Sequence, residues 1–216
     1  LKLQCIPEDE ELWKIENYEK FLEKRREMLS EKLNNFLENI SVTETNFKSA
    51  VDVQKIIESG EDRFIEYKSS MRWNLRENKA DKEIEKTILK TISGFSNADG
   101  GTLLIGVSDD GEVLGLQDDY NTLKEPNKDH FELHLKNIIN SEIGNAFGVS
   151  NITITFPTVD EIDICMVEIT PSNQPIYLEV RDRNGNKSKK FYVRSGNRTQ
   201  ELEIDQAAEY IKSHFA

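Results

Sequence analysis

Three carboxylates and a lysine, divided between two short segments, could form a metal-dependent catalytic site. Glu61 and Glu66 belong to the first segment, together with Lys68, and Asp109 belongs to the second, where Asp110 is an alternate. Mg²⁺ and Mn²⁺ prefer oxygen ligands, and a bound ion of this kind can activate water against a phosphodiester bond. The residue types therefore predict a divalent-metal site formed by Glu61, Glu66 and Asp109. The alternative is a Glu66–Lys68 ion pair on an exposed edge strand, which would have no chemical role.

Two strands and one helix would have to position these side chains. Period-2 alternation over 62–69 predicts a short strand with Glu66 and Lys68 on one face. The apolar run over 101–108 predicts a second strand, and the loop after it, where functional residues often lie, begins with the aspartates. Between the strands, apolar residues at helical spacing predict a helix over 80–97, which ends at an Asn-Ala-Asp-Gly-Gly sequence.

The rest of the main domain alternates between short strands and helices. An Asn184-Gly185 sequence indicates a β-hairpin. The order and lengths of the elements predict an α+β domain with a mixed, mostly antiparallel sheet and flanking helices. The further strands predicted are 151–157, 162–170, 175–180 and 190–195, with a minor one near 112–116, and the further helices are 128–146 and 203–215.

An amphipathic segment precedes this domain. Apolar residues recur at spacings of three and four over 9–40, which predicts a long helix, and 41–46 is interpreted as a polar linker before a short helix at 47–58. The predicted domains are an N-terminal helical appendage with its linker at 1–46 and a main domain at 47–216. Because the first residue is Leu, we expect a fragment of a longer chain. Its long helix would pack against the main domain or a second copy in a homodimer, or be the tail of a preceding domain.

Composition indicates a soluble protein, which we expect in the cytoplasm. Charged residues make up 31% of the 216 residues, the formal net charge is −12, and no apolar run is long enough to span a membrane. No signal peptide is recognisable. The two cysteines, Cys5 and Cys165, lie far apart in the sequence, which excludes a cysteine-based zinc module and fits a reducing compartment.

Positive charge is concentrated in one region of this acidic chain. Between 181 and 198 there are seven basic residues and one acid, which form either a nucleic-acid contact or a solvated hairpin tip. Trp73, with Arg72 and Arg76, could form an aromatic and basic edge for single-stranded nucleic acid, although a single Trp is more often a packing residue. The residues expected to bind the nucleic-acid backbone are Arg183, Lys187, Lys189, Lys190, Arg194 and Arg198.

Two other patterns are less specific. Gly100 and Gly101 could let backbone amides approach a phosphate, but the P-loop sequence is absent, and a helix C-terminus leading into a strand explains both glycines. His130 and His134 share one helix face, but the sequence around them is not the HExxH pattern of metalloproteases. We predict that the two histidines form a surface or partly buried pair.

Together, the two carboxylate segments resemble the signature of the Schlafen AlbA_2 domain family, some members of which are described as DNA-binding or ATP-binding. The resemblance extends over about residues 56–216, and Asp62 departs from it because family members often have Ser there. The matching residues are Glu61, the run 66–70 (Glu-Tyr-Lys-Ser-Ser), Phe95, Asn97, Gly100, Gly101, Leu103, the run 105–107 (Ile-Gly-Val), Asp109, Gly111, Val113, Gly115 and the closing segment 191–199.

This resemblance implies an α+β fold and association with nucleic acid. In the Schlafen proteins that cleave RNA it implies a Glu-Glu-Asp trio that holds a divalent ion for cleavage of tRNA and rRNA. The matching positions are Glu61, Glu66 and Asp109, and Lys68 would position the water or scissile phosphate, as in the similar PD-(D/E)xK nucleases. The hypothesis is nucleic-acid binding, RNA favoured over DNA, with Mg²⁺- or Mn²⁺-dependent endoribonuclease activity. The alternatives are a non-catalytic regulatory or assembly module of a larger defence- or transcription-linked protein, and an ATP-binding domain.

Overall fold

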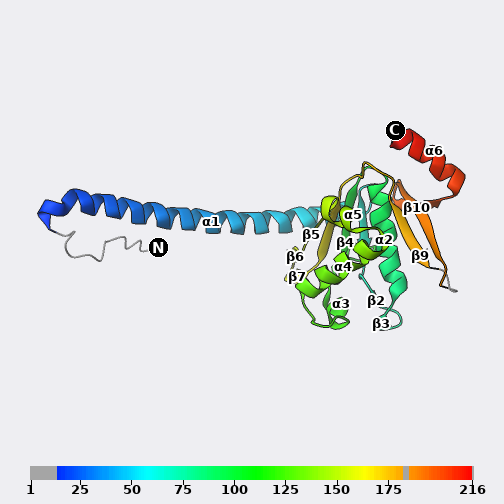
Figure 1. Cartoon of the computed structure of the whole chain (residues 1–216). Coiled ribbons are helices and arrows are strands. Elements are labelled where there is room, and N and C mark those ends of the chain that lie inside the picture. The colour runs from blue at the N-terminus through cyan, green and yellow to red at the C-terminus, as the bar shows by residue number, and fades with distance from the viewer. Residues whose placement is uncertain (1–13, 182–184, 216) are drawn as a thin grey trace. The chain divides into compact units, whose positions relative to one another are not determined.

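The computed structural model describes the backbone of residues 14–181 and 185–215, and their side chains except those of 33–52, 145 and 146. The chain divides into two units, Leu1–Ser49 and Ala50–Ala216 (Figure 1). Unit 1 contains the 3-10 helix η2 (Ile15–Asn17) and most of α1 (Tyr18–Ser59). Residues 41–46, predicted as a linker, are helical and continuous with the helix predicted at 47–58. No Pro or Gly interrupts this stretch, so nothing in its local sequence ends the helix.

Unit 2 is built around a four-stranded sheet in the order β1-β4-β8-β5. Strand β4 pairs in parallel with β1, so that Glu66 lies opposite Leu103 and Lys68 opposite Ile105. The other pairings are antiparallel, which confirms the predicted mixed, mostly antiparallel α+β architecture. The strands are β1 (Ile65–Lys68), β4 (Gly101–Ile105), β8 (Cys165–Ile169) and β5 (Ile152–Thr155).

Alternating side chains of this sheet enter two hydrophobic cores. Leu103 belongs to the larger core, together with buried residues of α2 (Lys82–Ser96) and α4 (Lys128–Glu142), which lie in front of the sheet in Figure 1. Tyr67 and Leu104 belong to the second core, with Val53 from the end of α1. Because successive strand residues point to opposite faces, Tyr67 in the second core directs its neighbours Glu66 and Lys68 to the other face of β1.

A three-stranded antiparallel sheet, β11-β10-β9, also packs against α2. Its first two strands, β9 (Tyr177–Arg181) and β10 (Lys187–Ser195), form the hairpin that the Asn-Gly sequence predicted. Strand β11 (Arg198–Leu202) and helix α6 (Ile204–His214) complete the chain, and α6 packs through Ala207 on Phe191 of β10. Strand β10 also brings Arg194 close to β1.

Several short elements differ from the sequence prediction. The strand expected over 162–170 is divided into β7 and β8, the segment near 112–116 makes only an isolated bridge from Val113 to Val107, and α4 ends four residues earlier than expected, at Glu142. Short elements depend on tertiary contacts rather than on local pattern, so periodicity does not find them. Strand β11 was not predicted either. The other elements not predicted are β2 (Trp73–Asn74), β3 (Lys79–Ala80), α3 (Gln117–Asn121), α5 (Asn145–Ser150) and β6 (Thr158–Val159), which pairs with β7 (Ile162–Asp163).

The glycines after α2 determine the path of the chain into β4. Gly100 has a φ of +78°, and a Cβ there would lie 2.6 Å from the carbonyl oxygen of Ile169. Its N–H donates to the carbonyl oxygen of Phe95, 3.0 Å away, near the end of α2. A helix C-terminus leading into a strand therefore accounts for this glycine without a bound phosphate.

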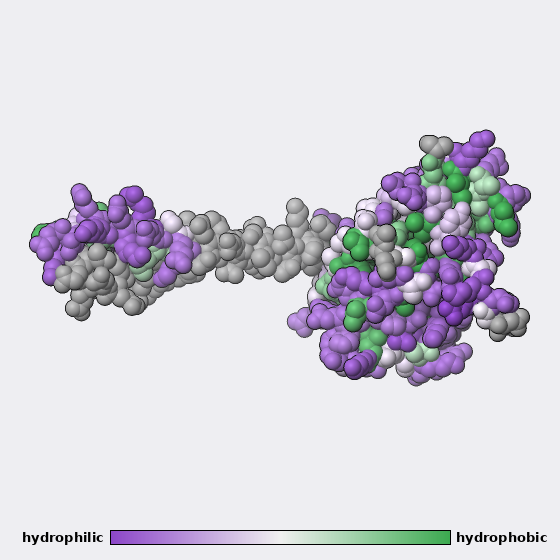
Figure 2. Space-filling model, in the orientation of Figure 1, coloured by the Kyte–Doolittle hydropathy of each residue, from purple (hydrophilic) through white to green (hydrophobic). Residues whose placement is uncertain are grey.

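The surface of unit 2 is mostly hydrophilic on the face shown in Figure 2, with hydrophobic residues visible near α6. Among the residues that the structure describes, no helix is both long enough and apolar enough to cross a membrane.

Candidate functional site

The carboxylate of Glu66 lies between two cations. Its Oε1 accepts a hydrogen bond from Lys68 Nζ at 2.5 Å, and its Oε2 accepts one from Arg194 Nη1, also at 2.5 Å. The side chain of Glu66 is 13% exposed, that of Lys68 21%, and that of Arg194 only 2%. Glu66 and Lys68 form the ion pair of the alternative interpretation, and β1 is an edge strand of its sheet. The pair is not on the open surface, however, because it lies in a three-residue network that is largely removed from water.

Arg194 is a structural part of this network. Its Nη2 donates to the carbonyl oxygens of Asp62 and Ile65, at 2.6 and 3.2 Å, and its guanidinium lies 4.9 Å from the centre of the Phe95 ring. These contacts tie β10 to the segment around β1. Sequence reasoning placed Arg194 among the backbone-binding residues, but its buried side chain is used within the protein. We therefore leave it out of the proposed nucleic-acid contacts.

The other two carboxylates of the predicted metal site have different surroundings. Glu61 accepts a hydrogen bond from the Tyr67 N–H at 2.7 Å, and Asp109 is exposed after β4. In the part of the chain that the structure describes, no group of three or more His, Cys, Asp or Glu residues is placed to hold a metal ion. With Glu66 already neutralised by two cations, the donors in this conformation do not fit a resident ion.

Lys68 and Asp109 nevertheless share an open cavity of about 340 Å³, which we call the β2 cavity. Trp73 and Asn74 of β2 line it, as do Leu75 and Arg76 from the turn that follows. Leu75 is 50% exposed and Trp73 is half-buried, so both present apolar surface to solvent beside the cations Lys68 and Arg76. The other lining residues are Ser69, Ser70, Ile84 and Thr87.

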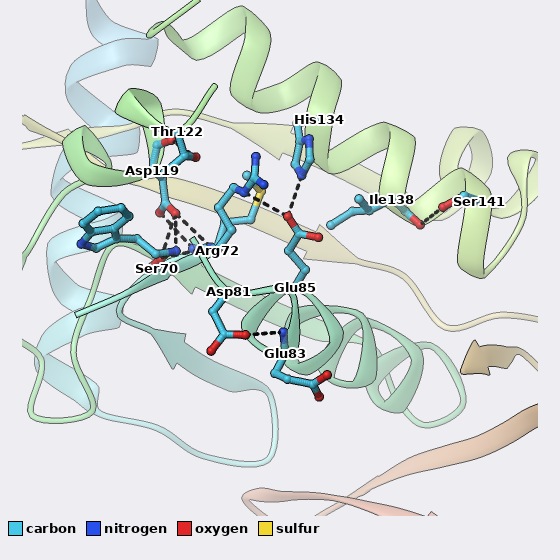
Figure 3. A network of polar contacts seen from close by, with 12 residues as sticks. Ser70, Arg72, Asp81, Glu83, Glu85, Asp119, Thr122, His134, Ile138 and Ser141 are labelled. Atoms are coloured by element: carbon cyan, nitrogen blue, oxygen red, sulfur yellow. Dashed lines mark hydrogen bonds and ion pairs between the residues drawn. The ribbon is translucent and has the colours of Figure 1, made fainter. Parts of the chain in front are cut away.

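A buried aspartate that sequence reasoning missed holds the segment between β1 and β2. Asp119 of α3 is 1% exposed, and its carboxylate accepts four hydrogen bonds: from Ser70 Oγ at 2.8 Å and from the backbone N–H groups of Met71, Arg72 and Trp73 at 2.9 to 3.1 Å (Figure 3). Burial raises the pKa of Asp119, against the lowering effect of these bonds. Its position in an acidic stretch gave no signal, because the partners are more than forty residues away.

The remaining predicted backbone-binding residues lie on β10 and β11, apart from Arg183, which falls outside the described residues. Lys187 pairs with Glu179 at 2.6 Å, and Lys190 pairs with Glu201 at 2.5 Å. Lys189 and Arg198 are exposed, and neither has an ion-pair partner among the described residues. Cross-strand carboxylates thus neutralise part of this basic run, as the solvated-hairpin alternative requires.

The two histidines of α4 have separate partners. His130 Nδ1 lies 3.2 Å from Asn127 Oδ1, and His134 Nε2 lies 2.9 Å from Glu85 Oε1. Arg72 Nε is 3.1 Å from the same Glu85 oxygen, so Glu85 links α2, α4 and the segment after β1 (Figure 3). Both histidine side chains are partly buried, as predicted from the sequence.

Two solved structures resemble the fold only distantly. The DIP2311 protein from Corynebacterium diphtheriae is 14% identical with a TM-score of 0.47, and the match covers 71% of this chain but only 28% of that one. The N-terminal domain of a RecG-related protein from Nitrosomonas europaea is 20% identical with a TM-score of 0.42, covering 72% of this chain and 94% of that domain. At these TM-scores neither likeness supports a functional argument.

A comparison with curated proteins finds no match. The family model described as "Schlafen, AlbA_2" matches residues 61–203, which is more than half of the chain and includes Glu61, the Glu66–Lys68 pair, Asp109 and Arg194. The chain therefore belongs to the Schlafen AlbA_2 family.

Proposed function

We propose that unit 2 binds nucleic acid at the β2 cavity, with RNA favoured over DNA by the family resemblance. The observation that supports this proposal is the juxtaposition of Trp73 and Leu75 with Lys68 and Arg76 around one open cavity. A base that stacks on an aromatic side chain gains about 1–3 kcal/mol, and nearby cations contact the phosphates on either side. Proteins that bind single-stranded nucleic acid without sequence preference combine an aromatic platform with positive charge in this way.

The segment that carries Trp73 is held rigidly, which favours binding. Its backbone N–H donates to both Ser70 Oγ, at 2.6 Å, and Asp119 Oδ1, at 3.1 Å. A platform whose backbone is fixed before the ligand arrives loses less conformational entropy on binding. Lys68 is similarly restrained by its contacts with Glu66 and with the Tyr67 carbonyl oxygen at 2.7 Å.

Hydrolysis of the bound nucleic acid is a second candidate function, supported by the position of Lys68. Glu66 holds its ammonium group, and the exposed carboxylate of Asp109 lines the same cavity. Lys68 would orient the scissile phosphate there, and Asp109 is the carboxylate that a bound substrate could reach. Because the described conformation pairs Glu66 with two cations, we assign no step to a metal ion.

Binding is tested by fluorescence anisotropy with labelled tRNA and single-stranded DNA. Trp73→Ala should weaken binding about 5- to 150-fold, the loss of one stacked base, whereas Trp73→Phe should retain most of the affinity. Arg76→Ala should weaken binding and reduce its salt dependence, while Lys212→Ala, which removes an exposed charge on α6, should not. Equal affinities for wild type, Trp73→Ala and Arg76→Ala would contradict the proposal.

Cleavage is tested with end-labelled tRNA in the presence of Mn²⁺. Asp109→Asn is the informative variant, because Asp109 is exposed and its substitution leaves the Glu66 network intact. Loss of cleavage in Asp109→Asn with unchanged tRNA binding would support an enzyme. Salt-sensitive binding without cleavage by the wild type would leave a binding module, and an absence of both would favour the regulatory or assembly hypothesis.

A further inference from the structure

Unit 2 has a second, larger cavity, of about 500 Å³, between α2, α4 and β9. It is distinct from the β2 cavity because α2 presents different faces to the two. Ile84 and Thr87 line the β2 cavity, whereas positions 82, 85, 86 and 89, which share one helix face, line this one. We call it the α2–α4 cavity. Its volume lies within the range of small-molecule sites.

The charges around the α2–α4 cavity are unusual for a chain of net charge −12. Three carboxylates line it: Glu85 contacts Arg72 and His134, Glu179 contacts Lys187 from outside the cavity, and Glu142 lies at the end of α4. Lys82 and Arg181 also line the cavity and are exposed. In the described part of the chain neither is in an ion pair, although Arg181, after Lys187, lies close enough to Glu179 to lower the pKa of that carboxyl. The rim therefore carries two cations that are not engaged in an ion pair among the described residues.

The floor of the cavity is apolar. Leu89 of α2 and Leu178 of β9 are almost fully buried, and Ile138 of α4 and Val180 of β9 are packed against the same core. Arg72 lies beside this floor and is fixed by its contact with Glu85, as Figure 3 shows. The cavity therefore combines an apolar surface with guanidinium and ammonium groups, which bind phosphate through charge-assisted hydrogen bonds.

From this combination we infer that the α2–α4 cavity binds a small phosphomonoester that carries a planar apolar group, a ligand about the size of a mononucleotide. The phosphate lies at the rim between Lys82 and Arg181, and the planar group lies on Ile138 and Val180, the partly exposed apolar residues of the lining. This site is independent of nucleic-acid binding at the β2 cavity.

Isothermal titration calorimetry with AMP, adenosine and ribose 5-phosphate tests the inference. AMP should bind the wild type, and adenosine and ribose 5-phosphate should each bind at least about tenfold more weakly, since each lacks one of the two recognised groups. The double variant Lys82→Ala/Arg181→Ala should weaken AMP binding at least about tenfold, and Lys212→Ala should not. Both substituted residues are exposed, and a thermal melt verifies that the double variant is folded.

Failure of the wild type to bind AMP would overturn the inference, as would unchanged AMP affinity in the double variant. A third outcome separates the two cavities: Trp73→Ala should leave AMP binding unaltered. If Trp73→Ala removes AMP binding while Lys82→Ala/Arg181→Ala does not, AMP occupies the nucleic-acid site and the inference is wrong. Nucleic-acid binding measured on the same proteins fails or succeeds separately.

Discussion

The buried contact between Arg194 and Glu66 supports β1 and should contribute strongly to stability. Arg194→Met removes the guanidinium and retains an apolar side chain. Loss of the guanidinium removes the hydrogen bond to Glu66 Oε2 and the two hydrogen bonds to the carbonyl oxygens of Asp62 and Ile65. Since the Arg194 side chain is 2% exposed, water cannot readily replace these bonds.

The expected loss of unfolding free energy follows from this burial. Removing one partner of a buried ion pair costs about 3–5 kcal/mol. The lower end applies here, because Glu66 keeps its bond to Lys68 after the substitution. For a domain of this size, about 3 kcal/mol lowers Tm by roughly 6–12 °C. Lys68→Met is the matched control: Lys68 is the more exposed partner of the same carboxylate, so its removal should cost about 1 kcal/mol or less.

Urea unfolding followed by circular dichroism measures these differences, and Glu66→Gln/Arg194→Met completes a double-mutant cycle. The pair should show a coupling free energy of at least about 1 kcal/mol. The reasoning is refuted if Arg194→Met lowers the unfolding free energy no more than Lys68→Met does. It is also refuted if the effects of Glu66→Gln and Arg194→Met on the unfolding free energy are additive, because the buried network then does not stabilise β1. The result also decides how a loss of cleavage in Glu66 variants is interpreted, because such variants disturb the fold.

Three further predictions concern the other polar contacts. Asp119→Asn should lower the unfolding free energy by about 2–4 kcal/mol, since an amide cannot accept all four bonds and leaves at least one buried N–H or O–H unpaired; a cost below about 1 kcal/mol in urea unfolding would contradict this. The pKa of Asp119 is raised above its ordinary value of 3.8, so the folded state binds this proton more tightly than the unfolded state. The stabilisation that comes from binding this proton is complete below about pH 3.8 and is lost as the pH rises through the raised pKa. The unfolding free energy of the wild type relative to Asp119→Asn should therefore decrease between pH 3.8 and the raised pKa. Lys190→Ala, which breaks the exposed pair with Glu201, should leave Tm almost unchanged, and a clear fall in Tm would show that the β10–β11 pair is structural.

The sequence was sufficient to predict the elements with strong periodicity. Alternation identified β1 and the correct faces of Glu66 and Lys68, because a buried Tyr67 requires its neighbours to point the other way. The apolar spacing over 80–97 and the glycines after it located α2 and its end. Strands β2 and β3 have only two residues each, and the segment that leads into β2 donates its hydrogen bonds to Asp119. A local pattern contains no trace of that contact.

The candidate site was only partly predictable, for a related reason. Residue types identified the Glu66–Lys68 pair, which lies within one strand. They could not show that Arg194, 128 positions away, occupies the second oxygen of Glu66, because pairing across the fold is decided by the packing of β10 on α2. A basic residue in a basic run therefore predicted a phosphate contact, whereas its burial assigns it to the support of a carboxylate.

The net charge of −12 does not count against anion binding, because local and total charge act over different distances. At physiological salt, charges separated by more than about 8 Å are largely screened. The affinity of a phosphate in either cavity therefore depends on the cations that line it, such as Lys68 and Arg76 or Lys82 and Arg181. The acidic remainder acts mainly on the approach of the ligand, since long-range repulsion is strongest at low salt. At low salt, the association rate constant for nucleic acid should therefore be lower than that of a protein with the same local cations but without the acidic surface. The dissociation rate constant should depend mainly on the cations that contact the phosphates.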